Sequence, residues 1–214
     1  MAKIYKNKSE LIDDFIDDAD IVLDAGFWGQ GVGVNSNNWV HKMLLDKAKE
    51  VYGIDVDFDL SKLADIGNYK QNYKKRSAEN FDFRVKFDVI FAGDIIEHLS
   101  NPGLFLKSCA KNLKNGGRLI ITTPNCFNLF HLAEKISKAE PTVNPDHVCY
   151  FNAKTLRRLL EKNGWRVKEI AYLHSLGVDY PESYKKKFLN VLYSAVSKFT
   201  PKFLETLTIV AEKI

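Results

Sequence analysis

The sequence predicts an α/β fold with a mostly parallel sheet, and three observations lead to this prediction. Short apolar runs alternate with segments of helical periodicity along most of the 214 residues. The first two apolar runs each end in an aspartate, Asp24 and Asp55, as strands bordering a ligand site often do. No repeat or shift in composition marks a second unit, and single cores keep growing to roughly 250 residues. Residues 1–214 are therefore expected to form one domain.

Composition narrows the class of protein further. Apolar residues make up 45% of the chain, charged residues 27%, and the formal net charge is only +4. This mild charge gives no reason to expect a nucleic-acid partner. Cys109, Cys126 and Cys149 form no CxxC pair, which fits a reducing cytoplasm. The charged N-terminus and the lack of about 18 consecutive apolar residues predict a cytoplasmic protein without a transmembrane segment.

The first half of the chain alternates helices with strands. In order, the spacing predicts a lead-in helix over Leu11–Ile16, a strand over Asp20–Asp24, a helix capped by Ser36, a strand over Glu50–Asp55 and a short helix through Leu60, Leu63 and Ile66.

The second half continues the alternation. It predicts a weak strand over Tyr73–Ser77, a strong strand over Phe87–Gly93, a helix from Pro102 to Leu113, a strand over Arg118–Thr122, a helix from Ala153 to Asn163, a strand over Trp165–Tyr172 and a final strand over Leu204–Glu212. Seven strands are expected in all.

Two segments fall outside this alternation, at about 124–150 and 175–201. Both follow the carboxyl end of a strand, where ligands bind in open α/β sheets, so we expect them to cover the substrate. Within the second, residues 184–199 have an apolar helical face. A lid packed on the domain explains this face, and a dimerising helix or one that contacts a membrane to collect a lipid-linked substrate is the alternative.

The glycines after Asp24 predict a loop that approaches a ligand closely. Gly26, Gly29 and Gly31 do not have the GxGxxG spacing that places a pyrophosphate on a helix N-terminus, so a ligand without a pyrophosphate is favoured. Asp55 can accept hydrogen bonds from a ribose diol. Helix–strand packing by the glycines and helix capping by Asp55 are the structural alternatives.

Further motifs show a resemblance to class I S-adenosylmethionine (SAM)-dependent methyltransferases over nearly the whole chain. They are Val22–Gly26, Val51–Asp55, Phe87–Leu99, Asn101–Leu106, Leu113–Asn125, Asp146–Phe151 and Leu156–Leu160. The combination of Glu97-His98-Leu99 with Thr123-Pro124-Asn125 is similar to the branch of quinone-biosynthesis and small-molecule or glycan O-methyltransferases. The resemblance implies a Rossmann-like three-layer sandwich with a mostly parallel seven-stranded sheet and an antiparallel last strand.

The resemblance also implies which residues bind the cofactor SAM. Asp24, Ala25, Gly26, Gly29 and Gly31 would line its methionine and ribose side. Asp55 would hold the ribose hydroxyls, Val56 would press on adenine, Ser77 and Ala78 would meet the adenine amino edge, and Asp94 would face the methionine end.

The chain departs from the family pattern at two points, both of which bear on cofactor affinity. Phe27 and Trp28 lengthen the interval between the first two glycines by one residue. Ser77 stands where the family often has an aspartate, and a hydroxyl accepts from the adenine amine more weakly.

Methyl transfer needs alignment of the reacting groups, and a general base is useful when the acceptor is a hydroxyl. His98 is the first candidate, Glu97 could orient it, and His147 or His131 could reach the same cleft. Asn125 is placed to bind polar groups of a substrate. Each histidine also has a structural interpretation, and no complete metal ligand set is evident.

The expected function is methyl transfer to a hydroxyl of a small molecule, a glycan or a lipid-linked intermediate. A non-catalytic binding module of the same fold is the main alternative. A nicotinamide-dependent oxidoreductase is disfavoured by the glycine spacing.

Overall fold

The structure is a computed structural model, and it describes residues 2–28, 33, 36–59, 61, 72–137, 143–174 and 200–214. Its strands are β1 (Lys3–Tyr5), β2 (Ile21–Ala25), β3 (Glu50–Asp55), β4 (Tyr73–Lys75), β5 (Phe87–Gly93), β6 (Leu113–Pro124), β7 (Trp165–Leu173) and β8 (Thr206–Lys213). Its helices are α1 (Lys8–Phe15), α2 (Val40–Lys47), α3 (Pro102–Asn112), α4 (Leu129–Ser137) and α5 (Ala153–Lys162), with short 3-10 turns η3 (Ile96–His98) and η4 (Pro201–Phe203).

The strands form one sheet in the order β1-β7-β8-β6-β5-β2-β3-β4. The pairs among β2 to β6 are parallel, whereas β8 runs antiparallel to both β6 and β7. This arrangement confirms the expected Rossmann-like sheet with an antiparallel last strand. All seven predicted strands are present, and β1 is an eighth that the sequence did not reveal because three residues are too few for a periodic pattern.

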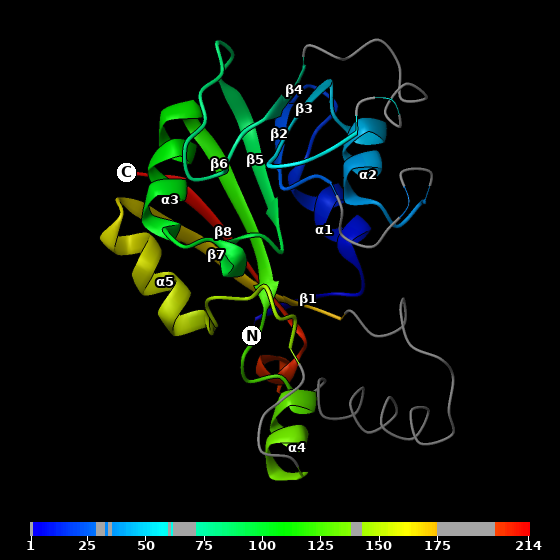
Figure 1. Ribbon diagram of the computed structural model, residues 1–214, viewed down its shortest axis with the longest axis vertical. Coiled ribbons are helices and arrows are strands. Elements are labelled where there is room, and N and C mark those ends of the chain that lie inside the picture. Colours follow the sequence, from blue (N-terminus) through cyan, green and yellow to red (C-terminus); the bar gives the residue numbers. More distant parts are fainter. Residues whose placement is uncertain are drawn as a thin grey trace.

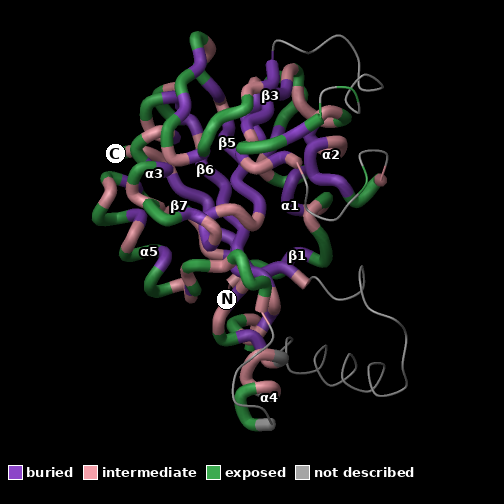
Figure 2. The backbone as a smooth tube through the Cα atoms, viewed as in Figure 1, coloured by how far each residue is buried: buried purple, intermediate pink, exposed green. Residues whose placement is uncertain are grey.

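Helices cover both faces of the sheet and make three layers (Figure 1). α1 and α2 lie on one face, and α3 and α5 lie on the other. Each face has its own apolar cluster: one contains Leu11, Leu44 and Val51, and the other contains Phe105, Leu156 and Trp165. The central strands are buried along nearly their whole length, as Figure 2 shows. Burial on both faces explains the almost continuous apolar run of β5.

Local sequence explains where several helices begin. Pro102 occupies the first turn of α3, where its missing N–H costs nothing. Asn152 caps α5 by accepting from the backbone N–H groups of Lys154 and Thr155. The prediction of Ser36 as the cap of α2 was wrong: the helix begins at Val40 after Trp39, and the Ser36 hydroxyl accepts from Asn38 N instead. Likewise, β6 begins at Leu113, five residues before the predicted Arg118, and α3 ends at Asn112.

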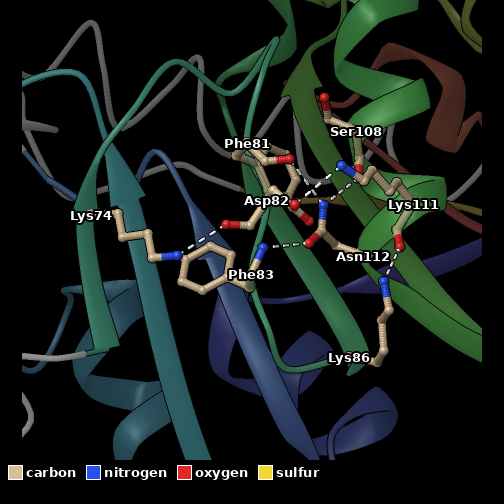
Figure 3. Close-up of polar contacts among 8 residues, drawn as sticks. All are labelled: Lys74, Phe81, Asp82, Phe83, Lys86, Ser108, Lys111 and Asn112. Atoms are coloured by element: carbon tan, nitrogen blue, oxygen red, sulfur yellow. Dashed lines mark hydrogen bonds and ion pairs between the residues drawn. The ribbon is translucent and has the colours of Figure 1, made fainter.

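The loop between β4 and β5 is fixed at its far end by the buried side chain of Asn112 (Figure 3). Its Oδ1 accepts from Phe83 N at 2.8 Å, and its Nδ2 donates to Phe81 O at 3.1 Å. Lys74 donates to Asp82 O and lies 4.1 Å from the centroid of the Phe83 ring. The near end of this loop carries Ser77 and Ala78, so these contacts restrain two residues expected to meet adenine.

Some expectations lie outside the described residues. They are the short helix through Leu60, Leu63 and Ile66, the glycines Gly29 and Gly31, and nearly all of the second cover segment with its helical face at 184–199. Among the helices that are described, none has the length and apolar character required to cross a bilayer.

Candidate active site

A cavity lies at the carboxyl ends of the parallel strands. The chain continues from β2 to β3 on one side, and β5 pairs with the other side of β2, so the strand order reverses at β2. Ligands bind at such switch points in open α/β sheets. The cavity has a volume of about 1030 Å³ and is lined by residues that follow β2, β3, β4, β5 and β6. It is at the upper end of the size range of small-molecule sites, roughly 300–1,000 Å³.

Asp55 stands at the β3 end of the cavity. Its Oδ2 accepts from Trp28 N at 3.0 Å and its Oδ1 from Asp57 N at 3.3 Å. Burial raises the pKa of this carboxyl above its ordinary value, although the backbone N–H groups act in the opposite direction. A carboxylate can accept about four hydrogen bonds, so Asp55 retains capacity for hydroxyl donors.

Apolar and small residues surround the same end of the cavity. The Val56 side chain is 73% exposed although it lies beside a buried strand. Val56, Ser77 and Ala78, for which the resemblance implies adenine contacts, all line the cavity. An exposed valine at this place offers an apolar surface to a flat ligand.

Gly26 occupies the turn after β2, where only glycine fits. Its φ is +80°, and a Cβ at this position would lie 2.7 Å from Cδ1 of Ile95. The Gly26 N–H donates to Ile54 O at 2.8 Å, which joins the turn to β3. The backbone of Gly26 therefore lines the cavity with no side chain in the way.

Asp94 follows β5 in the left-handed region, with a φ of +52°. Its Oδ1 accepts from the Thr122 hydroxyl at 3.2 Å, and its Oδ2 accepts from Lys8 Nζ at 2.6 Å. Burial lowers the pKa of Lys8, but the charge and hydrogen bond of Asp94, with the charges of Asp24 and Glu97, raise it above its ordinary value. Strained aspartates of this kind cluster at functional sites.

Glu97 is buried in η3, with 1% of its surface exposed. Its Oε2 accepts from the Thr123 hydroxyl at 2.8 Å, while Oε1 has no hydrogen-bond partner among the described residues. Burial, together with the charge of Asp94, raises the pKa of Glu97 to about 8. The backbone carbonyl of Glu97 accepts from Val148 N and Cys149 N, which ties the 143–150 segment to this turn.

His98 and His147 meet edge to face, with ring centroids 4.6 Å apart. Both line the cavity. Burial, and then the charge of His98, lower the pKa of His147. One ligand atom from each of Glu97, His98 and His147 lies within 4.8 Å of the others, close enough to share a cation. The structure thus brings the three predicted catalytic residues together.

Comparison with known proteins shows the family to which the chain belongs. A family model described as a methyltransferase domain matches residues 19–170, well over half of the chain. The chain belongs to this methyltransferase family. Membership of this family implies that its cofactor is SAM.

Individual relatives align with only part of this chain. A ubiquinone biosynthesis O-methyltransferase from Nitrobacter winogradskyi is 41% identical over 103 residues, which are 46% of this chain and 40% of that protein. A probable S-adenosylmethionine-dependent methyltransferase from Mycolicibacterium smegmatis is 27% identical over 165 residues, 73% of this chain and 56% of that protein. The chain therefore spans about half the length of these two relatives.

Solved structures agree with the fold. A SAM-dependent methyltransferase from Archaeoglobus fulgidus matches 96% of this chain and 91% of its own, with a TM-score of 0.63 and 20% identity. A methyltransferase from Bacillus halodurans matches 96% of this chain and 97% of its own, with a TM-score of 0.62 and 20% identity. At this level of identity the likeness concerns the fold alone.

The residues of the methyltransferase cavity fit SAM chemically. The half-buried Asp55 carboxylate suits a ribose diol, and the exposed Val56 suits a base. Lys8 and Asp94 form an ion pair, so the site has a positive group for the carboxylate of SAM and a negative group for its amino group. Donor and acceptor groups are therefore present for each part of the cofactor.

Of the predicted cofactor residues that the structure describes, two are not among those lining the cavity. Asp24 and Ala25 are buried in β2, and Asp24 Oδ2 lies 3.0 Å from Nδ1 of His41. His41 is fully buried in α2, and its Nε2 lies 2.9 Å from the Tyr73 hydroxyl. Asp24 near the end of β2 therefore contacts His41, a residue that the sequence did not indicate as part of the site.

Asn125 and His131 also take positions other than those expected. Asn125 is buried, and its Nδ2 donates to the backbone carbonyls of Lys202 and Leu204, so it joins β6 to the chain before β8. His131 lies on α4, is half-buried and is not among the residues that line the cavity. The prediction that Asn125 binds substrate was wrong, because its amide is used for these internal contacts.

Sequence reasoning missed two residues: Lys8, which lines the cavity, and His41, which contacts Asp24. Lys8 occupies the first turn of α1, where the helix dipole disfavours a cation, and this mismatch was the available signal. His41 lies beside the apolar face of its helix, and a polar residue there indicates a buried partner. Trp28 was expected only as part of the lengthened glycine loop, and its contact with Asp55, 27 positions away, had no local signal.

Proposed function

We propose that this chain transfers the methyl group of SAM to a hydroxyl of a small molecule, a glycan or a lipid-linked intermediate. One observation carries the proposal: a single cavity contains Asp55 at the end of β3 and the His98–His147 pair beyond β5 and β6. β2 lies between these two ends in the sheet order. A cofactor and an acceptor can therefore share the cavity, with the reacting groups between them.

We assign the cofactor contacts as follows. Asp55 accepts from the ribose hydroxyls, Val56 and Ala78 contact the adenine ring, and Ser77 accepts from its amino group. The backbone at Gly26 allows close approach, and Asp94 and Lys8 bind the amino and carboxylate groups of the methionine part. Lys8 extends the expected set, and Gly29 and Gly31 remain in it as residues outside the described part.

Bound SAM supplies an electrophilic methyl group on a sulfonium, and the chain has to position the acceptor and remove its proton. His147 suits the second task because its lowered pKa keeps the ring neutral near pH 7. The neighbouring His98 contacts the His147 ring edge to face and restricts its orientation. Glu97 is protonated at neutral pH because its pKa is raised, so it acts through hydrogen bonds rather than as a charge.

The hydroxyl acceptor is supported by the relatives' names. The relative from Nitrobacter winogradskyi is a ubiquinone biosynthesis O-methyltransferase, and the aligned 103 residues are 41% identical. A base at the acceptor end is also more useful for a hydroxyl than for a nucleophile that carries no proton of high pKa.

We further propose that residues 1–214 act as one methyltransferase domain, with segments 124–150 and 175–201 covering the substrate. The 124–150 segment supports this, since Asn144, Asp146 and His147 line the cavity. A cytoplasmic location is supported by three cysteines in the free thiol state. A homodimer, or peripheral membrane contact through 184–199, remains a proposal from the sequence alone.

Calorimetry tests the cofactor part of this proposal. We expect S-adenosylhomocysteine, the demethylated product, to bind and NAD not to bind. Lack of S-adenosylhomocysteine binding at millimolar concentration would instead support a non-catalytic module. Transfer of a labelled methyl group from SAM to a panel of catechols and glycans then tests the acceptor class, and methylation of amines alone would contradict the hydroxyl assignment.

A further inference from the structure

The lengthened glycine loop contains an aromatic anchor. Phe27 is 2% exposed, and its ring centroid lies 5.1 Å from those of Phe58 and Tyr73 and 4.9 Å from that of His41. Its carbonyl accepts from Nε1 of Trp39 at 2.8 Å. Phe27 therefore contacts α2, β4 and the segment after β3, and it fixes the first residues of the loop.

Gly53 in β3 makes room for this anchor. A Cβ at Gly53 would lie 2.8 Å from Cδ1 of Phe27 and 2.7 Å from Cδ1 of Tyr73. The glycine of the second motif and the added aromatic residue in the first motif are thus matched to each other. The absence of a side chain at Gly53 of β3 therefore allows the position that Phe27 takes in the loop.

Trp28, the next residue, lies at the edge of this aromatic cluster, where it also lines the cavity. It is half-buried, lines the cavity, and packs against Phe27, Trp39 and Phe58 at centroid distances of 6.1, 6.4 and 6.5 Å. Its backbone N–H donates to Asp55 Oδ2 at 3.0 Å. One residue therefore joins an aromatic ring in the cavity to the carboxylate at the end of β3.

We propose that Trp28 positions the nucleoside half of the cofactor, its N–H orienting Asp55 toward the ribose diol and its ring forming a wall of the adenosine subsite, with Phe27 as the anchor. This inference rests on the proposed function. A fixed carboxylate loses less freedom when it binds a diol, and an aromatic wall gives a base or ribose an apolar surface. The departure from the family's glycine spacing thereby adds contacts to the cofactor site.

Two variants of Trp28 test the inference through S-adenosylhomocysteine binding, measured by calorimetry. Trp28→Ala removes the ring and keeps the N–H, and we expect about tenfold weaker binding, as for the loss of one stacked base. Trp28→Phe keeps both a ring and the N–H and should restore affinity to within about threefold. The melting temperature of each variant is measured to separate binding from folding.

Fluorescence supplies a readout that packing alone would not change. The chain has three tryptophans, and Trp39 and Trp165 are 3% and 0% exposed, so Trp28 is the one most open to a ligand. We expect S-adenosylhomocysteine to change the emission of the unaltered chain, and Trp28→Phe to remove most of that change. Trp165→Phe, on the distant strand β7, is the control and should retain it.

The outcomes separate this inference from the proposed function. If the unaltered chain binds S-adenosylhomocysteine but Trp28→Ala binds it within about twofold, or if the emission change survives in Trp28→Phe, the inference is wrong and the function stands. If the unaltered chain does not bind S-adenosylhomocysteine at all, both are overturned.

Discussion

At the residue scale, Asp55 carries the proposed ribose contact, and its neighbour Asp57 provides a matched comparison. Asp55 is half-buried in the cavity, whereas Asp57 is exposed and pairs with Lys75 at 2.8 Å. We expect Asp55→Ala to weaken S-adenosylhomocysteine binding by about tenfold or more, because each hydrogen bond to a charged group contributes about 1.5–3 kcal/mol. Asp57→Ala should change the dissociation constant by less than about twofold. If calorimetry shows that the two substitutions change the dissociation constant equally, Asp55 does not bind the ribose.

Glu97 predicts a pH dependence of stability. Its pKa is raised from an ordinary value of 4.5 to about 8 by burial and by Asp94. Between these values the folded chain holds a proton that the unfolded chain has released, so the free energy of unfolding falls as the pH rises. Its contribution to stability is fully present below about pH 4.5 and is lost as the pH passes through about 8.

Urea unfolding of Glu97→Gln from pH 5 to pH 8 tests this dependence. The amide does not titrate, so the stability of the unaltered chain relative to the variant should fall by about 1 kcal/mol per pH unit. Glu161→Gln on the exposed side of α5 is the surface control. A stability difference between the unaltered chain and Glu97→Gln that is constant over this range would show that Glu97 is ionised in the folded state.

At the element scale, His41 joins α2 to the carboxyl end of β2 and to β4. It lies between Asp24 and Tyr73, and all three side chains are buried. His41→Leu would leave a buried carboxylate and a buried hydroxyl without this partner, and we expect a loss of about 3 kcal/mol in the free energy of unfolding.

Denaturant unfolding measures this loss, with Lys42→Leu on the same helix as the control. Adding Asp24→Asn to His41→Leu should recover part of the stability, because a neutral amide costs less to bury than an unpaired carboxylate. If the double variant is less stable than His41→Leu alone, Asp24 is stabilised by groups other than His41.

The elements show how far local sequence determines this fold. Strands such as β5 were predictable because burial on both faces requires a continuous apolar run. The start of α2 was not, since Ser36 looks like a cap in sequence while the chain needs three further residues before Val40. β1 has only three residues, and its pairing with β7 depends on tertiary contacts that no local pattern contains.

At the scale of the whole molecule, the sheet order explains why the sequence also predicted much of the site. Asp55 ends a strand, and Ser77, Asp94 and His98 each follow one; parallel strands bring their carboxyl ends to one edge. Lys8 and Trp28 depend on how α1 and the glycine loop fold over that edge, which spacing along the chain does not encode. The assignment of Asp24 to the cavity lining missed its use by His41 for the same reason.

A crystal structure with bound S-adenosylhomocysteine tests the proposed cofactor site through the distances from the ribose hydroxyls to Asp55. We predict that both hydroxyls lie within about 3.2 Å of the Asp55 carboxylate oxygens, with the sulfur on the side of Asp94 and His98. An ordered ligand outside this cavity, or one whose ribose points away from Asp55, would contradict the proposed site.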